Sequence, residues 1–277
     1  MLRSMYSGIS GLRGFQTKLD VIGNNIANVN TFGFKKGRVT FKDMINQQVQ
    51  GASSPQQNRG GTNPRQVGLG SQLGSIDTIH TPGNTQTTSR PLDLAVSGEG
   101  FFIVNDGQLS YYTRAGNFYL DQEGNLVNAD GLYVQGYPAE DGEVDTDAAL
   151  TNLRVTSRED AEIESFDISQ SGEITAIYTN GDIEVLGQIA LATFNNPEGL
   201  SKAGDNLYLV SNNSGEADIR IAGETAGAII GGTLEMSNVD LAEEFTEMIV
   251  AQRGFQANTR IITTSDEILQ ELVNLKR

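Results

Sequence analysis

Few side chains in this 277-residue sequence could do chemistry, and their spacing matches no common catalytic site. The single histidine, His80, follows Asp77 by three residues, and a histidine beside a carboxylate can act as an acid–base pair. No nucleophile motif such as G-x-S-x-G accompanies them, so we expect His80 to be a surface histidine. The chain has no cysteine, which excludes disulfides, thiolate metal sites and cysteine nucleophiles. Composition and motifs together predict a protein that is not an enzyme.

Two further patterns could bind a ligand, but each lacks residues that the binding requires. Four carboxylates alternate along one stretch, a spacing that could collect Ca²⁺, although the Gly and the Glu of an EF-hand loop are absent. They are Asp141, Glu143, Asp145 and Asp147. The sequence Gly98-Glu99-Gly100 lacks the third glycine of a dinucleotide-binding loop. We therefore expect a solvated acidic loop and a strand bend, with no cofactor and no metal.

The charge of the chain also limits its partners. A formal net charge of −16 and a pI near 4.4 argue against nucleic acid, because phosphate binding needs clustered cations. No apolar run reaches the roughly 18 residues of a membrane-spanning helix, so we expect no membrane insertion. The N-terminus lacks the apolar core of a cleaved signal peptide.

Any functional surface must therefore come from the elements themselves, beginning with a helix from Leu2 to about Ile26. Its apolar residues recur at spacings of three and four, which is typical of an amphipathic helix. They are Leu2, Met5, Ile9, Leu12, Phe15, Leu19, Ile22 and Ile26. Four glycines interrupt it, each costing about 1 kcal/mol relative to alanine. Such a helix needs a partner surface, although a core helix of an ordinary domain shows the same pattern.

The C-terminal segment, residues 240–277, predicts a longer helix with a heptad stripe. Five apolar residues stand seven apart, and others widen the stripe, as in a coiled-coil seam. The five are Leu241, Met248, Phe255, Ile262 and Leu269, and the stripe also includes Phe245, Ile249, Ile261, Leu272 and Leu275. Asn258 and Ser265 interrupt the companion core positions, so a plain buried helix remains an alternative.

Between the two helices the apolar period becomes two, which predicts an antiparallel β domain over residues 91–234. Residues 46–90 are polar and poor in apolar side chains, and we interpret them as an extended connecting segment that braces neighbouring subunits. The predicted fold class is α+β. We expect residues 1–45 and 235–277 to pair as a helical, coiled-coil domain, with the β domain inserted between them.

Long stretches of the sequence support a more specific interpretation. Residues 20–44 read DVIGNNIANVNTFGFKKGRVTFKDM, and residues 235–277 include EMSNVDLAEEFTEMIVAQRGFQANTR. LDLAVSGEGFFIV and YTRAGNFYLDQEGNLVNADGLYVQGYPA lie between them. These stretches closely resemble the bacterial flagellar axial proteins, the family of rod and hook subunits. The positions that match the family's N-terminal motif are Asn24, Asn25, Ala27, Asn28, Thr31, Gly33, Phe34 and Lys35.

The resemblance implies a structural subunit that self-assembles into a helical tube in the flagellum. It implies export through the flagellar export apparatus without a cleaved signal, and the implied partners are further copies of the chain, other axial proteins of the rod and hook–filament junction, and the hook cap. NLVNADGLYVQGYPA and the C-terminal LVNLKR favour the curved hook, a universal joint. The polar insertion at residues 47–66 favours the alternative, the straight distal rod, which acts as a drive shaft. A monomeric β-rich surface binding protein is a more remote alternative.

Two expectations concern the family motif. The resemblance implies that the coiled-coil domain is the inner domain of the tube and the β domain the outer one. The asparagines that follow the first helix tolerate left-handed backbone, and their side chains could hold a bend between the inner and outer domains, or simply cap the helix. A basic cluster follows, and we expect it to face the acidic β domain of a neighbouring subunit. It comprises Lys35, Lys36, Arg38 and Lys42.

Overall fold

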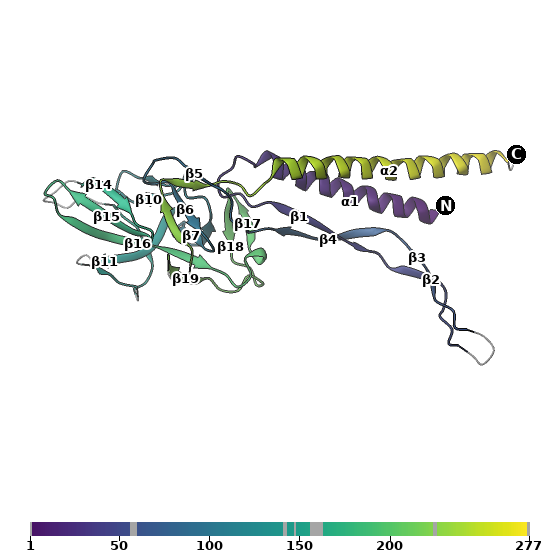
Figure 1. Ribbon diagram of the computed structural model, residues 1–277, viewed down its shortest axis with the longest axis horizontal. Coiled ribbons are helices and arrows are strands. Elements are labelled where there is room, and N and C mark those ends of the chain that lie inside the picture. Colours follow the sequence, from purple (N-terminus) through teal and green to yellow (C-terminus); the bar gives the residue numbers. More distant parts are fainter. Residues whose placement is uncertain are drawn as a thin grey trace. The chain divides into compact units, whose positions relative to one another are not determined.

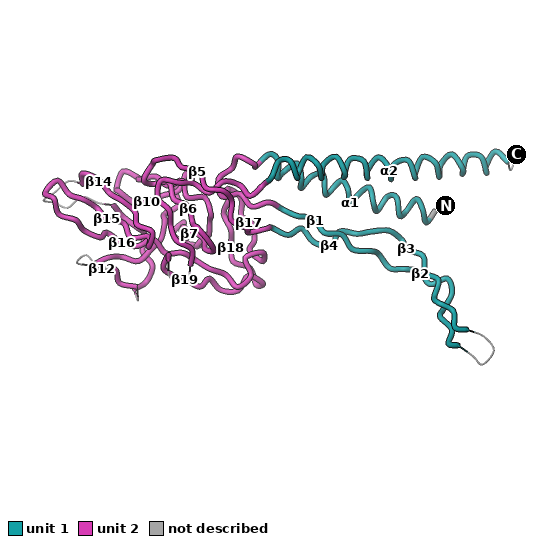
Figure 2. Tube along the Cα trace, in the orientation of Figure 1, with its two compact units in different colours: residues 1–27, 37–78, 240–277 teal, residues 28–36, 79–239 magenta. Residues whose placement is uncertain are grey.

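The computed structural model describes residues 2–55, 60–140, 143–146, 148–155, 163–223 and 226–275. Asp141 and Asp147 of the acidic run lie outside these residues, as does the side chain of Glu143. The chain divides into two compact units, shown in teal and magenta in Figure 2. Unit 1 comprises residues 1–27, 37–78 and 240–277, and unit 2 comprises residues 28–36 and 79–239.

Unit 1 contains the two helices that the sequence predicts. Helix α1 spans Leu2–Ala27 and helix α2 spans Leu241–Asn274. Asp240 is the N-cap of α2, because its carboxylate accepts hydrogen bonds from the backbone N–H groups of Ala242 (2.8 Å) and Glu243 (3.4 Å). Within the part of the chain that the structure describes, neither helix combines the length and hydropathy that crossing a membrane requires.

Two antiparallel strand pairs complete unit 1. Strand β1 (Gly37–Asp43) pairs with β4 (Ser71–Thr78), and β2 (Asn46–Gln50) pairs with β3 (Arg65–Gly68). Both pairs are interrupted by a register shift. In Figure 1 the two pairs follow one another, and β2 and β3 form the arm that leads away from the helices. The aromatic ring of Phe41 from β1 lies 6.4 Å from that of Phe15. This contact packs the first strand pair against α1.

Unit 2 is a β structure in which thirteen of the described strands join one antiparallel sheet. Its central path runs β14-β15-β16-β11-β7-β8-β18-β17. In chain order the strands of the sheet are β7 (Phe101–Asn105), β8 (Ser110–Thr113), β9 (Tyr119–Leu120), β10 (Leu126–Val127), β11 (Tyr133–Glu140), β12 (Glu143–Val144), β13 (Thr151–Asn152), β14 (Ile163–Ile168), β15 (Glu173–Tyr178), β16 (Ile183–Thr193), β17 (Ser201–Gly204), β18 (Leu207–Leu209) and β19 (Asp218–Ile221). The predicted Asn180-Gly181 turn joins β15 to β16, with Gly181 at φ 83°.

Two smaller strand pairs lie outside this sheet. Strand β6 (Leu94–Ser97) pairs with β20 (Ala228–Gly231), and β5 (Thr85–Thr87) pairs with β21 (Thr233–Glu235). A short 3₁₀ helix, η1, spans Pro197–Gly199. Gly98-Glu99-Gly100 lies in a bend between β6 and β7, as predicted. The protein is therefore α+β, with two helices and a predominantly β body.

The core of unit 2 forms where inward-facing residues of these strands meet. Phe102 and Phe118 are fully buried and their rings meet edge to face at 5.1 Å. Leu126, Ile189 and Leu191 pack in the same cluster. Buried residues alternate with half-buried or exposed ones along β15, which is the period of two that the sequence predicts.

Candidate functional site

The two terminal helices pack side by side in opposite directions, which makes their joint surface the first candidate site (Figure 1). Near one end of the pair Gly8 faces Ile262, and near the other Lys18 forms an ion pair of 3.0 Å with Glu247. Glycine permits a close approach at the centre: a Cβ atom at Gly254 would lie 2.5 Å from Cζ of Phe15. The two helices are therefore in close contact along this seam, and a larger residue at position 254 would push them apart.

The face of α2 toward α1 is built mostly from small and polar side chains. Glu244, Ala251 and Ser265 are buried, and Asn258 is half-buried, with its amide beside Gly11. Asn258 and Ser265, which interrupt the apolar heptad pattern, thus lie within the seam. A small-residue seam leaves little room for the large apolar residues of the helix.

The predicted heptad stripe of α2 divides between the seam and the exposed surface. Met248, Ile262 and Leu269 are half-buried. The exposed members are Leu241 (40%), Phe245 (49%), Ile249 (58%), Phe255 (37%), Ile261 (45%), Leu272 (49%) and Leu275 (82%). The buried and half-buried positions of α2 themselves recur every seven residues, as Glu244, Ala251, Asn258 and Ser265 do. Part of the apolar stripe lies beside these positions and stays uncovered within the chain.

The predicted residues of α1 show a similar division. Ile22 is buried, and Met5, Leu12, Leu19 and Ile26 are half-buried. Ile9 is 37% exposed, and the side chain of Leu2 is not among those that the structure describes. Most of the predicted α1 stripe thus faces the interior of unit 1, while Ile9 remains accessible.

Asn25 of the family motif ties three elements of unit 1 together. Its side-chain Nδ2 donates to the carbonyl of Gly37 (2.9 Å) and to Oε2 of Glu244 (3.2 Å). Its Oδ1 accepts from the backbone N–H of Gly37 at 2.9 Å. Asn25 is only 2% exposed, so one buried amide connects the end of α1 with the starts of β1 and α2.

The remaining motif residues shape the segment that follows α1. Asn24 and Ala27 are exposed at the end of the helix, and the hydroxyl of Thr31 donates to Oδ1 of Asn28 at 3.1 Å. Gly33 has φ 68°, and a Cβ there would lie 2.6 Å from the backbone nitrogen of Ala115. Only glycine fits this turn without strain. Phe34, the next residue, is buried.

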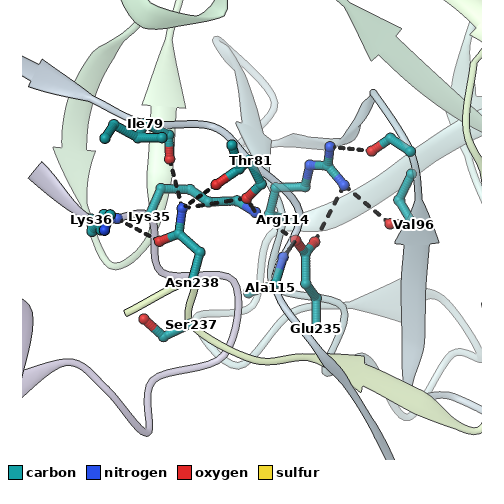
Figure 3. Close-up of polar contacts among 12 residues, drawn as sticks. Lys35, Lys36, Ile79, Thr81, Val96, Arg114, Ala115, Glu235, Ser237 and Asn238 are labelled. Atoms are coloured by element: carbon teal, nitrogen blue, oxygen red, sulfur yellow. Dashed lines mark hydrogen bonds and ion pairs between the residues drawn. The ribbon is translucent and has the colours of Figure 1, made fainter. Parts of the chain in front are cut away.

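Lys35 is fully buried, and the expectation that it faces a neighbouring subunit is wrong. Its Nζ donates to Oε1 of Glu235 (2.5 Å) and to the carbonyl of Thr81 (2.8 Å), as Figure 3 shows. Arg114 Nη1 donates to the other carboxylate oxygen of Glu235 at 3.2 Å. The backbone N–H of Gly83 also donates to Glu235 Oε1 at 2.9 Å. A buried charge must be paired, and here one carboxylate serves two cations.

This Lys35–Glu235–Arg114 cluster joins segments that are distant in the sequence. Arg114 also donates to the carbonyls of Val96 (3.2 Å) and Gly98 (2.6 Å). Burial lowers the pKa of the Lys35 ammonium and of the Arg114 guanidinium, whereas the Glu235 carboxylate opposes both shifts. The cluster fixes the segment after α1 and the segment before α2 onto the β body of unit 2.

His80 lies beside this cluster and is half-buried, so the expectation of a surface histidine is also wrong. Its ring meets those of Phe101 (5.5 Å) and Tyr208 (5.4 Å) edge to face. Burial lowers the pKa of His80 to about 4, and the positive charges of Lys35 and Arg114 act in the same direction. His80 Nδ1 has no hydrogen-bond partner among the described residues. Asp77, its proposed acid–base partner, instead pairs with Arg38 at 3.5 Å.

Comparison with known protein families identifies three matching regions. The model for the flagella basal body rod protein matches residues 5–35. The model for the D1 domain of flagellar hook protein FlgE/F/G matches residues 95–176, and the model for the C-terminal part of flagellar basal body rod FlgEFG proteins matches residues 230–275. The matches cover both helices and much of the β body.

Individual relatives match over nearly the whole chain. The chain is 54% identical over 279 residues to flagellar basal-body rod protein FlgG of Bacillus subtilis, covering 100% of both. It is 36% identical to flagellar hook protein FlgE of Borreliella burgdorferi over 444 residues, again covering 100% of both. It is 34% identical over 273 residues to flagellar basal-body rod protein FlgG of Agrobacterium fabrum, covering 96% of this chain and 97% of the relative.

Proposed function

Because this chain belongs to the flagellar rod and hook protein family, a family of structural proteins of the bacterial flagellum, we propose that it is a subunit of the distal rod. In this role the chain polymerises into the straight tube that transmits torque from the motor. Flagellar axial proteins polymerise in the rod and the hook, and the exposed apolar residues of α2 supply a surface for doing so.

The comparison of lengths supports the rod over the hook that two sequence motifs favoured. The match to the Bacillus subtilis rod protein needs almost no insertions, since it extends over 279 residues for a chain of 277. The match to the Borreliella burgdorferi hook protein extends over 444 residues, so that relative carries long segments with no counterpart here. This full-length match to a rod protein is the observation that carries the proposal.

The arm formed by β2 and β3 also supports a rigid tube. Every residue of both strands is exposed, and apolar side chains on the arm include Ile45 (83%), Val49 (63%) and Val67 (44%). A two-stranded arm of this kind has no core of its own and is at best marginally stable alone. We infer that it lies across a neighbouring subunit and braces the lattice, since a straight tube needs contacts that fix axial spacing.

The partners follow from this position in the flagellum. Further copies of the chain surround each subunit. Other rod subunits adjoin one end of the tube that these copies form, and the hook adjoins the other. The flagellar export apparatus delivers the chain. These partners are consequences of the proposed role.

Electron microscopy of basal bodies from the source bacterium tests the role directly. Cells that lack this chain should yield basal bodies whose rod is truncated and that carry no hook. A hook subunit would give a different result, because its absence leaves a rod of full length without a hook. Reintroducing the unchanged chain should restore rod, hook and motility, which provides the control. A full-length rod in the deletion cells would therefore overturn the distal-rod proposal in favour of the hook.

A further inference from the structure

Unit 1 contains an apolar groove of about 560 Å³ between α1 and the β1–β4 strand pair. Its apolar lining comes from both sides: Tyr6 and Ile9 from α1, and Met44, Leu69 and Leu73 from the strands and their ends. Three of these residues are substantially exposed, at 68% for Tyr6, 37% for Ile9 and 41% for Leu73. Exposed aromatic and aliphatic side chains gathered in one concavity indicate a docking surface.

The charged residues of the groove carry one sign. Arg3 and Arg13 line it, and no acidic side chain does so among the described residues. The two arginines lie ten residues apart on α1, which corresponds to about 15 Å along the helix. The groove therefore favours an occupant that is apolar on one face and acidic beside it.

The end of α2 has these properties and is uncovered within the chain. Gly8, near the start of α1, faces Ile262, so the last turns of α2 extend beyond α1, as Figure 1 shows. After Leu269 every described residue of α2 is exposed. Ile268 (44%), Leu272 (49%) and Leu275 (82%) follow one another at spacings of four and three, so they share one face.

Acidic residues flank this apolar row. Glu267 and Glu271 each precede one of its members and stand four residues apart, on the same side of the helix. Negative charge near a helix C-terminus opposes the helix dipole, and the last turn of α2 contains no basic residue. Lys276 and Arg277 follow the helix and lie outside the described residues. A cation from another surface, placed beside Glu267 and Glu271, would add to the stability of this end of α2.

We propose that the groove receives the C-terminal end of α2, residues 267–275, from a second copy of this chain. The apolar row of the incoming helix enters the groove, and its two glutamates lie beside Arg3 and Arg13. The inference rests on the proposed function, because it specifies which two surfaces meet when the subunits polymerise. Groove and helix end are different surfaces of one chain, so each copy can accept one neighbour and enter another, which gives an open-ended assembly.

Cross-linking between chains tests this contact, and the absence of cysteine makes the background clean. One chain carries Tyr6→Cys in the groove and the other carries Leu272→Cys on the apolar row. The matched control replaces Leu272→Cys with Gln270→Cys, which is two residues away and on the opposite side of α2. The two chains are mixed as monomers, polymerised and oxidised, and mixed disulfides are measured on a non-reducing gel.

We expect at least tenfold more mixed disulfide with Leu272→Cys than with Gln270→Cys, and only in the polymerised fraction. Suppose that polymers form but the two cysteine pairs give equal yields of mixed disulfide, or neither pair gives any. Either result overturns the inference and leaves the proposed function standing. Failure of the unchanged chain to polymerise would instead count against the proposed function itself.

A charge exchange gives a second, independent measurement. Arg13→Glu should reduce the polymerised fraction at least fivefold, because it places two carboxylate-rich surfaces together. Adding Glu271→Arg to the same chain should restore most of the loss, since every copy then contributes both exchanged charges. If the groove takes a different partner, the double variant will polymerise no better than Arg13→Glu alone, and the proposed contact is excluded.

Discussion

Replacing Glu235 with glutamine should destabilise unit 2 strongly without changing the shape of the side chain. The carboxylate is the shared partner of two buried cations, and the side chains of Lys35, Glu235 and Arg114 are 0%, 1% and 3% exposed. A neutral amide removes the negative charge but leaves both cations buried. The NH₂ group of the glutamine can only donate, and so can the side chains of Lys35 and Arg114, so this group would face a donor instead of an acceptor.

The expected cost follows from burial. Removing one partner of a buried ion pair costs about 3–5 kcal/mol, because it leaves an uncompensated charge in a low-dielectric environment. The matched control is Glu247→Gln. It neutralises a carboxylate that also forms an ion pair, but at the surface. Glu247 pairs with Lys18 at 3.0 Å, and its side chain is 48% exposed. Water screens such a pair, so we expect a loss of no more than about 1 kcal/mol.

The tyrosines provide a signal that isolates unit 2. The chain has no tryptophan, and all of its tyrosines except Tyr6 lie in unit 2. Urea unfolding followed by tyrosine fluorescence therefore reports this unit, while circular dichroism at 222 nm reports α1 and α2 of unit 1. With a slope of about 2–3 kcal/mol per molar urea, Glu235→Gln should lower the fluorescence midpoint by roughly 1–2 M.

Two outcomes would refute this reasoning. An unchanged fluorescence midpoint for Glu235→Gln would show that the buried cluster does not depend on the carboxylate charge. Glu247 lies in unit 1, so its variant is followed by circular dichroism at 222 nm. An equally large loss of stability for Glu247→Gln would show that burial does not decide the cost. The slope should be checked in both variants, because the comparison assumes that each unfolds in one transition.

Three further predictions concern the helices and the histidine. Gly23→Ala should stabilise α1 by about 1 kcal/mol, because nothing lies within 4 Å of the added methyl group. Gly254→Ala should instead lower the melting temperature of the helices, because its methyl group would press on Phe15. Thermal melts followed by circular dichroism at 222 nm check both. Since the pKa of His80 falls from 6.5 to about 4, the unfolded chain binds a proton that the folded chain does not, so unit 2 should lose up to about 3 kcal/mol of stability as pH falls across that range. His80→Gln should flatten this part of the pH profile, and an unchanged slope would contradict the assignment. Deleting residues 240–277 should leave unit 2 folded by tyrosine fluorescence but abolish polymerisation in a sedimentation assay, and polymers of the truncated chain would exclude the helices as the assembly surface.

The local elements of this fold could be predicted because their signals are local. The apolar spacing of α1 is visible within a few residues, and the period of two along β15 is equally short-range. These features place both helices and the β body. The heptad stripe of α2 was harder to interpret, because the sequence does not show which heptad positions face α1. Ala251 and Ser265 lie in the seam, whereas the larger Phe255 is exposed.

The buried charge cluster could not be predicted, because its members meet only in the folded chain. Lys35 stands in a run of basic residues, so its sequence context indicates a surface cation. Its partner Glu235 is 200 residues away, and Arg114 follows a buried strand. The arginine directly after the strand that contains Tyr111 and Tyr112 was the available signal, since a charge at the end of a buried strand needs a partner.

Electron micrographs of polymers formed by the purified chain test the distal-rod proposal most directly. The arm of β2 and β3 bracing adjacent subunits should give straight tubes, and removing residues 51–64 should make them flexible and curved without preventing assembly. Straight tubes from the full chain and curved ones from the shortened chain are the predicted result. Curved tubes from the full chain, with curvature unchanged by the deletion, would contradict it and indicate a hook subunit.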